Sequence, residues 1–173
     1  MAKQKARTRW GRMVGYRLVV VLLLMIQFEG VAQEMPPRPT AAFFLQNMAF
    51  GAFALTLSGG TVTVSTQGAR FATGGVILVN QGELYFPAIF GLQGNPGTIV
   101  HVLFGPDAVL TGSNGGSMTL HLEDSYPRDP IIINVAPPGN MQIMVGGTLN
   151  IGNLPANPPG HYSGSFSIMF IQE

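Results

Sequence analysis

The sequence has 173 residues, of which 46% are hydrophobic and 10% are charged, with a formal net charge of +1 and no cysteine. This length suits one domain with one core, and the lack of cysteine excludes disulfide staples and cysteine-based metal sites. Six of the nine Lys and Arg lie within the first 17 residues. Residues 33–173 keep three basic and seven acidic side chains, a net charge of −4, which argues against a nucleic-acid partner.

The amino-terminal segment has the pattern of a removable export signal. A basic stretch precedes the apolar residues 18–26, a run about half as long as the roughly 20 residues that span a bilayer. Gly30 and Ala32 have the spacing of small residues before a signal-peptidase cut. We therefore predict that residues 1–32 are a signal peptide cut before Gln33, with a cut after Gln33 or a retained membrane anchor as alternatives. The mature protein is then expected in the periplasm, at the outer-membrane surface or outside the cell.

Residues 33–42 are interpreted as a proline-rich leader arm. Pro36, Pro37 and Pro39 lack a backbone donor and favour an extended chain. The arm is predicted to be a stiff spacer or an interaction arm that precedes a domain spanning residues 43–173.

The rest of the chain predicts an all-β fold. Short apolar runs alternate with Gly, Asn, Pro and Ser, and no window of comparable length has helical periodicity. The predicted strands cover residues 45–57, 61–65, 76–79, 84–90, 98–104, 117–123, 131–135, 142–145, 148–151 and 163–171. Ten short strands exceed one flat sheet, so we expect two packed antiparallel sheets that form a β-sandwich.

Strict alternation of apolar and polar residues predicts which side chains form the core. The inward-facing set is expected to be Val62, Val64, Met118, Leu120, Leu122, Phe166, Ile168 and Phe170. Glycine pairs tolerate the positive φ of chain reversals. Turns are therefore predicted at residues 58–60, 73–75, 114–116 and 146–147.

The polar residues do not form a recognisable catalytic or metal constellation. His101, His121 and His161 fall in no short-spaced ligand motif, and a strand histidine between apolar neighbours most often faces solvent. Residues 123–129 could gather three carboxylates around calcium, but the spacing of an EF-hand loop is absent, and a solvated loop balanced by Arg128 is the simpler interpretation. Residues 162–166 lack the flanks of a nucleophile elbow. We therefore predict no enzyme activity, no catalytic or metal-binding residues and no cofactor.

Aromatic residues offer one alternative site. Tyr85, Tyr126 and Tyr162 could form a platform on which a sugar stacks. Packing roles within the fold are the competing interpretation.

Five sequence blocks carry a resemblance to a known family. They are residues 47–53 (NMAFGAF), 59–64 (GGTVTV), 68–70 (GAR), 146–149 (GGTL) and 160–166 (GHYSGSF). In this order they resemble the bacterial domain-of-unknown-function family 4402 over roughly residues 43–172. The resemblance implies an exported immunoglobulin-like sandwich without catalytic residues. The closing block is also similar to that of spore-coat-U type subunits of archaic chaperone-usher pili.

In pili of that type, the amino-terminal extension of one subunit completes the sheet of its neighbour by strand addition. Here residues 33–40 are short and hold three prolines, which would break the ladder of a donor strand. A donor would have to come from residues 41–45, which the domain also needs to begin. A self-complete sandwich and a subunit docked on a larger assembly are therefore the alternatives to donor-strand polymerisation.

The sequence thus predicts a non-enzymatic structural or interaction protein, a subunit or accessory of a bacterial cell-surface appendage or outer-membrane assembly. Its expected partners are other proteins, through self-assembly or within a larger envelope complex. An uncleaved signal or an outer-membrane partner would be its only link to a membrane. The alternative is an extracellular, adhesin-like module that binds a glycan or another surface.

Overall fold

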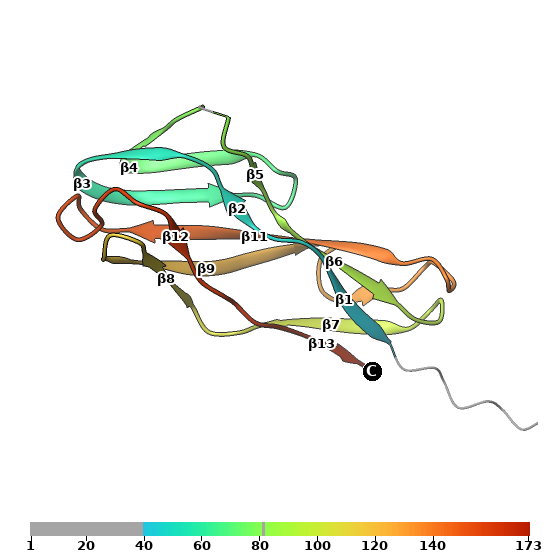
Figure 1. Ribbon diagram of the computed structural model, residues 1–173. Coiled ribbons are helices and arrows are strands. Elements are labelled where there is room, and N and C mark those ends of the chain that lie inside the picture. The colour runs from blue at the N-terminus through green and yellow to red at the C-terminus, as the bar shows by residue number, and fades with distance from the viewer. Residues whose placement is uncertain (1–39, 81) are drawn as a thin grey trace, which may run out of the picture. The chain divides into compact units, whose positions relative to one another are not determined.

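A computed structural model describes residues 40–80 and 82–173 (Figure 1). The chain divides into two units, Met1–Pro36 and Pro37–Glu173, and the described residues belong to the second. The predicted signal peptide, residues 1–32, and residues 33–39 of the predicted leader arm lie outside the described residues. The described part is all-β, as predicted, and contains no helix. No helix in this part is therefore long and apolar enough to cross a membrane.

Thirteen strands make up the described part of the chain. They are β1 (Ala41–Gln46), β2 (Ala49–Phe50), β3 (Phe53–Val64), β4 (Arg70–Leu78), β5 (Tyr85–Phe86), β6 (Ala88–Gln93), β7 (Ile99–Phe104), β8 (Ala108–Gly112), β9 (Ser117–Tyr126), β10 (Ile131–Ile132), β11 (Met141–Ile151), β12 (Tyr162–Ser163) and β13 (Ile168–Gln172). Every pairing between them is antiparallel.

The largest sheet is organised around β11, the long strand through the middle of Figure 1. The sheet runs β1-β6-β11-β9-β8-β12, and β3 joins it by pairing with both β11 and β4. One edge of β11 pairs with β9. The other edge pairs first with β6, through residues 141–145, and then with β3, through residues 147–151. Thus β11 exchanges one neighbour for another halfway along its length.

Two smaller sheets complete the fold. One has the order β10-β7-β13, and the other consists of β2 and β5. Val100 and Ile131 of the three-stranded sheet share one apolar cluster with Leu92 and Ile143 of the large sheet. The two sheets therefore enclose a common core.

The alternation in the sequence identified the core correctly. Val62, Val64, Met118, Leu120 and Leu122 are all buried. The last three residues of the predicted set, Phe166, Ile168 and Phe170, are partly buried and pack against the same core.

Three of the four predicted glycine turns are wrong. Residues 58–60 lie inside β3, residues 73–75 inside β4 and residues 146–147 inside β11. The β3–β4 register shifts between Leu55 and Gly60, and the β9–β11 register shifts at Gly146–Gly147. A Cβ on Gly147 would lie 2.9 Å from the His121 carbonyl oxygen, so these glycines allow close backbone approach at bulges rather than reversals. Only residues 114–116 connect two strands as predicted, with positive φ at Gly115 and Gly116.

Several strand boundaries also differ from the prediction. Residues 45–57 are divided among β1, β2 and β3, and Gly51, which adopts a φ of 67°, separates β2 from β3. Residues 142–145 and 148–151 form the single strand β11, and residues 163–171 divide between β12 and β13 in different sheets. Strand β8 and the first half of β4 were not predicted. The first strand begins at Ala41, two residues before the predicted start of the domain.

Candidate functional site

Two strand edges border one side of the domain, which we call the open side. The first edge consists of β1, β2 and the start of β3, and the second consists of β12 and β13. Among the described strands, β1 pairs only with β6, β2 with β5, β12 with β8 and β13 with β7. Residues 53–55 of β3 pair only with β4. Each edge therefore has one side on which its backbone meets no neighbouring strand.

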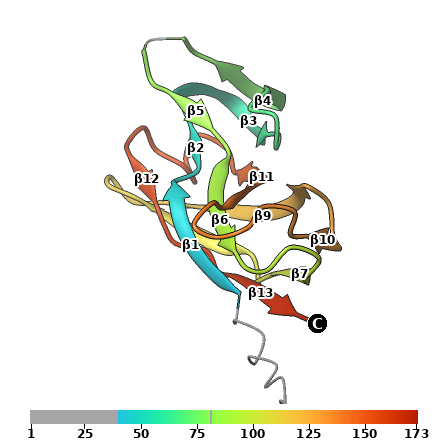
Figure 2. The same cartoon turned by 90° about the vertical axis from the view of Figure 1, so that its right-hand side faces the viewer.

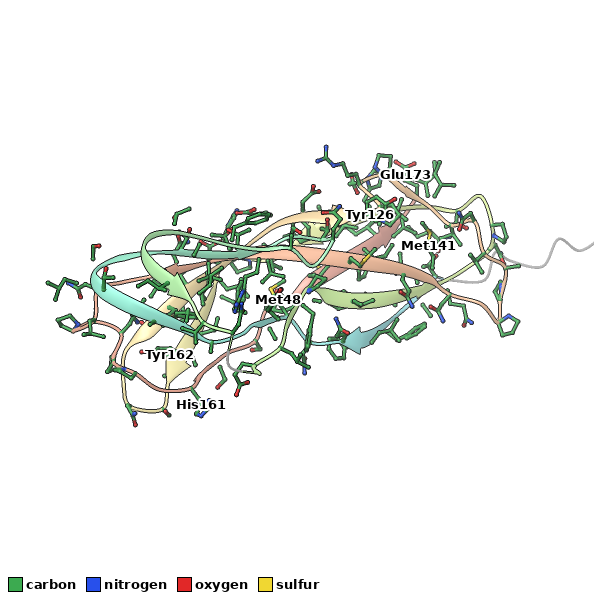
Figure 3. All side chains as sticks on the ribbon, turned by 90° about the horizontal axis from the view of Figure 1, so that it is seen from above. Met48, Tyr126, Met141, His161, Tyr162 and Glu173 are labelled. Atoms are coloured by element: carbon green, nitrogen blue, oxygen red, sulfur yellow. The ribbon has the colours of Figure 1, made fainter. Side chains whose placement is uncertain are left out.

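A groove of about 920 Å³ separates the two edges over part of their length. Its walls are residues 47–55 from the first edge and residues 158–164 and 166 from the second. Figure 3 labels Met48 on the first wall and Tyr162 on the second. The floor includes Met118, Leu120 and Leu149, core side chains that are only 2–4% exposed. The groove therefore opens onto the hydrophobic core itself.

The walls of the groove are apolar near its floor and of mixed polarity at its rim, where Leu84 is 71% exposed. The half-buried apolar side chains that line it and pack against the core are Met48, Phe50, Phe53, Leu55, Leu110, Tyr162 and Phe166. Asn47, Glu83 and His161 also line it, and all three are exposed. An extended segment with apolar side chains on one face matches this distribution.

The two edges meet at the other end of the open side. The backbone N–H and Oγ1 of Thr40 both donate hydrogen bonds to Gln172 Oε1, at 3.0 and 2.9 Å. The Phe90 ring contacts Phe44 and Phe170, with centroids 5.8 and 5.6 Å apart. Figure 2 shows the ends of β1 and β13 close together. The edges therefore converge at Thr40 and Gln172 and diverge towards the groove.

Arg70 fixes the first wall of the groove. Its guanidinium donates to the carbonyl oxygens of Phe50 and Ala52, at 3.0 and 3.2 Å, and to Val79 O and Asn80 Oδ1, at 3.3 and 2.9 Å. It also stacks over the Tyr85 ring at 4.3 Å. The planar fork of arginine can satisfy several carbonyls together. Arg70 thus stabilises the bend of the chain between β2 and β3.

Hydrogen bonds from Asn157 and Tyr162 fix the second wall. Asn157 is 1% exposed; its Nδ2 donates to Ser117 O at 2.7 Å, and its Oδ1 accepts from Gly152 N at 2.5 Å. The Tyr162 hydroxyl donates to Pro158 O at 2.8 Å. These bonds satisfy the buried amide and position residues 158–162 beside the groove.

The three histidines do not come together. His101 Nδ1 lies 3.0 Å from Asp129 Oδ2, and its Nε2 lies 3.1 Å from Glu173 Oε1. His121 Nδ1 lies 2.7 Å from Asp107 Oδ1, and this hydrogen bond raises the His121 pKa. His161 is the one that lines the groove. Within residues 40–80 and 82–173, no cluster of three or more His, Asp or Glu has the arrangement of a metal site.

The acidic stretch, residues 123–129, does not converge on a shared ligand position. Asp124 Oδ2 pairs with Arg128 at 3.2 Å, so Arg128 balances a neighbour as the simpler interpretation predicted. Asp129 instead contacts His101 and accepts a hydrogen bond from Val102 N at 2.8 Å. Asp124 and Asp129 are therefore engaged by different protein groups.

The three tyrosines likewise lie on different elements. Tyr85 belongs to β5 and lies under Arg70, Tyr126 ends β9, and Tyr162 begins β12. Figure 3 shows Tyr126 and Tyr162 far apart in the domain. The structure does not bring them together into one platform.

Sequence reasoning did not identify the groove. The sequence predicts one continuous strand that contains Met48, Phe50 and Phe53, and such a strand would not form the wall of a groove. The available signal was Gly51, whose positive φ interrupts that strand.

The described part of the chain is thus an all-β domain with one open, apolar side. Residues 43–171 match the family model described as "Domain of unknown function (DUF4402)", and the chain belongs to this family, as its five sequence blocks predicted. The match contains both walls of the groove. No curated protein and no solved structure matches the chain.

Proposed function

We propose that the protein is a non-enzymatic structural subunit or accessory of a bacterial cell-surface appendage or outer-membrane assembly. In this proposal its open side accepts a β-strand from another polypeptide chain. The domain would be an exported immunoglobulin-like sandwich that lacks one strand position, as in the spore-coat-U type pilus subunits that its closing block resembles.

The open groove is the observation that carries this proposal. A monomeric domain normally covers its core, yet the nearly buried Met118, Leu120 and Leu149 form the floor of a groove between two unpartnered edges. One added strand could hydrogen bond to both edges and place alternate apolar side chains on this floor. An apolar groove between free strand edges marks an interaction site because both features favour association.

The amino-terminal sequence supports export. Its basic stretch, short apolar run and small residues before Gln33 follow the pattern of a cleaved signal peptide. Export followed by cleavage would release the acidic domain in the compartment where envelope assemblies form.

In this proposal the added strand comes from another protein. Ala41–Gln46 is already paired with β6, so it is unavailable as a donor while that pairing lasts. Pro36, Pro37 and Pro39 in the preceding segment would each leave a gap in a hydrogen-bonded ladder.

Binding of a model strand tests the proposal. The probe is a fluorescent peptide of alternating valine and threonine with a lysine at each end, and fluorescence anisotropy reports its binding to the purified, processed protein. We expect saturable binding that Met48→Asp abolishes, since this substitution places a charge on the groove wall. Val109→Asp is the matched control, because Val109 is 59% exposed on β8 and does not line the groove.

Two outcomes would contradict the proposal. One is the absence of peptide binding, and the other is equal binding by the Met48→Asp and wild-type proteins. A protein that remains monomeric in size-exclusion chromatography, ignores the peptide and binds a glycan array would favour the glycan-binding alternative.

A further inference from the structure

His101 lies between two carboxylates that come from different segments. It is on β7, directly opposite Ile171 of β13. Its Nδ1 contacts Asp129 Oδ2 at 3.0 Å, and its Nε2 contacts Glu173 Oε1 at 3.1 Å. Asp129 precedes β10, and Glu173 follows β13. One imidazole ring thus connects the three strands β10, β7 and β13.

The number of protons on the ring decides whether both contacts can exist. An ionised carboxylate only accepts hydrogen bonds, and a neutral imidazole carries a single N–H. Both contacts are therefore hydrogen bonds only when the ring is the doubly protonated imidazolium. The hydrogen bond with Asp129 and then that with Glu173 raise the pKa of His101, outweighing partial desolvation.

The two carboxylates differ in how many hydrogen bonds hold them in place. Asp129 Oδ1 also accepts a hydrogen bond from Val102 N at 2.8 Å. The pKa of Asp129 is lowered mainly by this backbone hydrogen bond and secondly by the hydrogen bond with His101. The Glu173 side chain is 62% exposed and, among the described residues, has only the His101 ring as a hydrogen-bond partner. When the ring loses a proton, the Glu173 contact is the one expected to break.

We propose that His101 is a pH-sensitive latch that fastens the end of β13 to β7 when its ring is protonated and releases Glu173 when its ring is neutral. The Glu173 backbone N–H also donates to Ile99 O at 3.1 Å, so release of the side chain loosens the last rung of the β7–β13 ladder. The inference concerns the isolated domain and does not depend on strand binding. Only its consequence for the open side, which β13 borders, rests on the proposed function.

The direction of the pH effect follows from the raised pKa of His101. A group whose pKa is higher in the folded protein contributes its full stabilisation below its unfolded value of about 6.5. This contribution is lost as the pH rises through the folded value, so the latch is closed in mild acid and opens as the pH rises above that folded value. The charged groups that face the ring are Asp129 and Glu173; the neighbouring Arg128 pairs with Asp124.

Amide hydrogen exchange of the full domain tests the latch. The quantity measured by NMR is the protection factor of the Glu173 amide, corrected for the intrinsic effect of pH on exchange. We expect it to fall several-fold between pH 5.5 and pH 8 in the wild-type protein. Glu173→Gln should lower protection at pH 5.5 and remove its dependence on pH, because the charged partner of the ring is lost. It should also lower the pKa of His101, measured from the ring nitrogen shifts.

His121→Gln is the matched control, because His121 is another strand histidine paired with an aspartate. It should leave the pH dependence of Glu173 protection unchanged. The latch is wrong if wild-type protection does not vary between these pH values, or if Glu173→Gln leaves both the pH dependence and the His101 pKa as they are. These measurements need no peptide. They can therefore refute the latch while strand binding is confirmed, or confirm the latch while strand binding is refuted.

Discussion

The two ends of the domain differ in how their core is covered. At the closed end, β10 and β7 lie over the half of the large sheet built from β6 and β11, and Leu92, Val100, Ile133 and Ile143 have no exposed surface. At the open end, the core residues Met118, Leu120 and Leu149 form the floor of a groove whose two walls are not joined by a strand.

Within one core, the closed end therefore contributes to the stability of the fold, whereas the open end is available to bind a partner. The fully buried Leu92, Val100, Ile133 and Ile143 at the closed end have no surface left for a partner to cover, so they can only stabilise the fold. The half-buried side chains on the groove walls, such as Met48 and Phe50, retain apolar surface that another chain could cover. Each Å² removed from water contributes about 25 cal/mol. Substitutions at the two ends should therefore have different consequences.

The largest expected effect on stability comes from creating a cavity in the core at the closed end. Ile143→Ala should lower the free energy of unfolding by about 2–5 kcal/mol, because it leaves a cavity in a fully packed region. Met48→Ala, on the groove wall, should cost only about 1 kcal/mol, since Met48 is half-buried. Urea denaturation of both variants measures the difference. Equal losses would mean that the groove is as well packed as the closed end.

Arg70 should have the next largest effect, because it holds a wall of the groove in place. Arg70→Gln removes most of four hydrogen bonds and the stacking on Tyr85, and should destabilise the protein by about 2 kcal/mol. Arg128→Gln is the control, because the Arg128 side chain is 82% exposed and its ion pair is on the surface. Thermal unfolding compares the two. A smaller loss for Arg70→Gln than for Arg128→Gln would show that the bend after β2 does not need its guanidinium.

The smallest effect is expected on the polar face of the large sheet. The hydroxyls of Thr63 and Thr148 share a cross-strand hydrogen bond of 2.6 Å. Thr63→Val should lower the free energy of unfolding by about 0.5–1 kcal/mol, because the partially buried hydroxyl of Thr148 loses its partner. The double variant that also carries Thr148→Val should be nearly as stable as the wild type. A double-mutant cycle in urea measures the coupling. Additive losses would show that the bond contributes nothing.

The same contrast explains which parts of the structure the sequence could predict. Strand alternation is local, so Val62, Val64, Met118, Leu120 and Leu122 were identified as core residues without knowledge of their neighbours. The sequence predicts a turn at Gly146 and Gly147, but their actual role depends on β11 exchanging β6 for β3, a pairing between distant segments. The groove also depends on which strands lack a neighbour. Whether residues 47–55 and residues 158–166 have a neighbouring strand is determined only by the three-dimensional arrangement of the strands.

Hydrogen exchange at the two walls of the groove is the most direct test of the open side. Backbone amides of residues 47–55 and 158–166 that make no hydrogen bond should exchange rapidly in the free monomer. They should gain protection when the alternating valine–threonine peptide is added, but not when a peptide with proline at the valine positions is added. Protection of these amides in the free monomer, or no change at saturating peptide, would contradict an open side that accepts a strand.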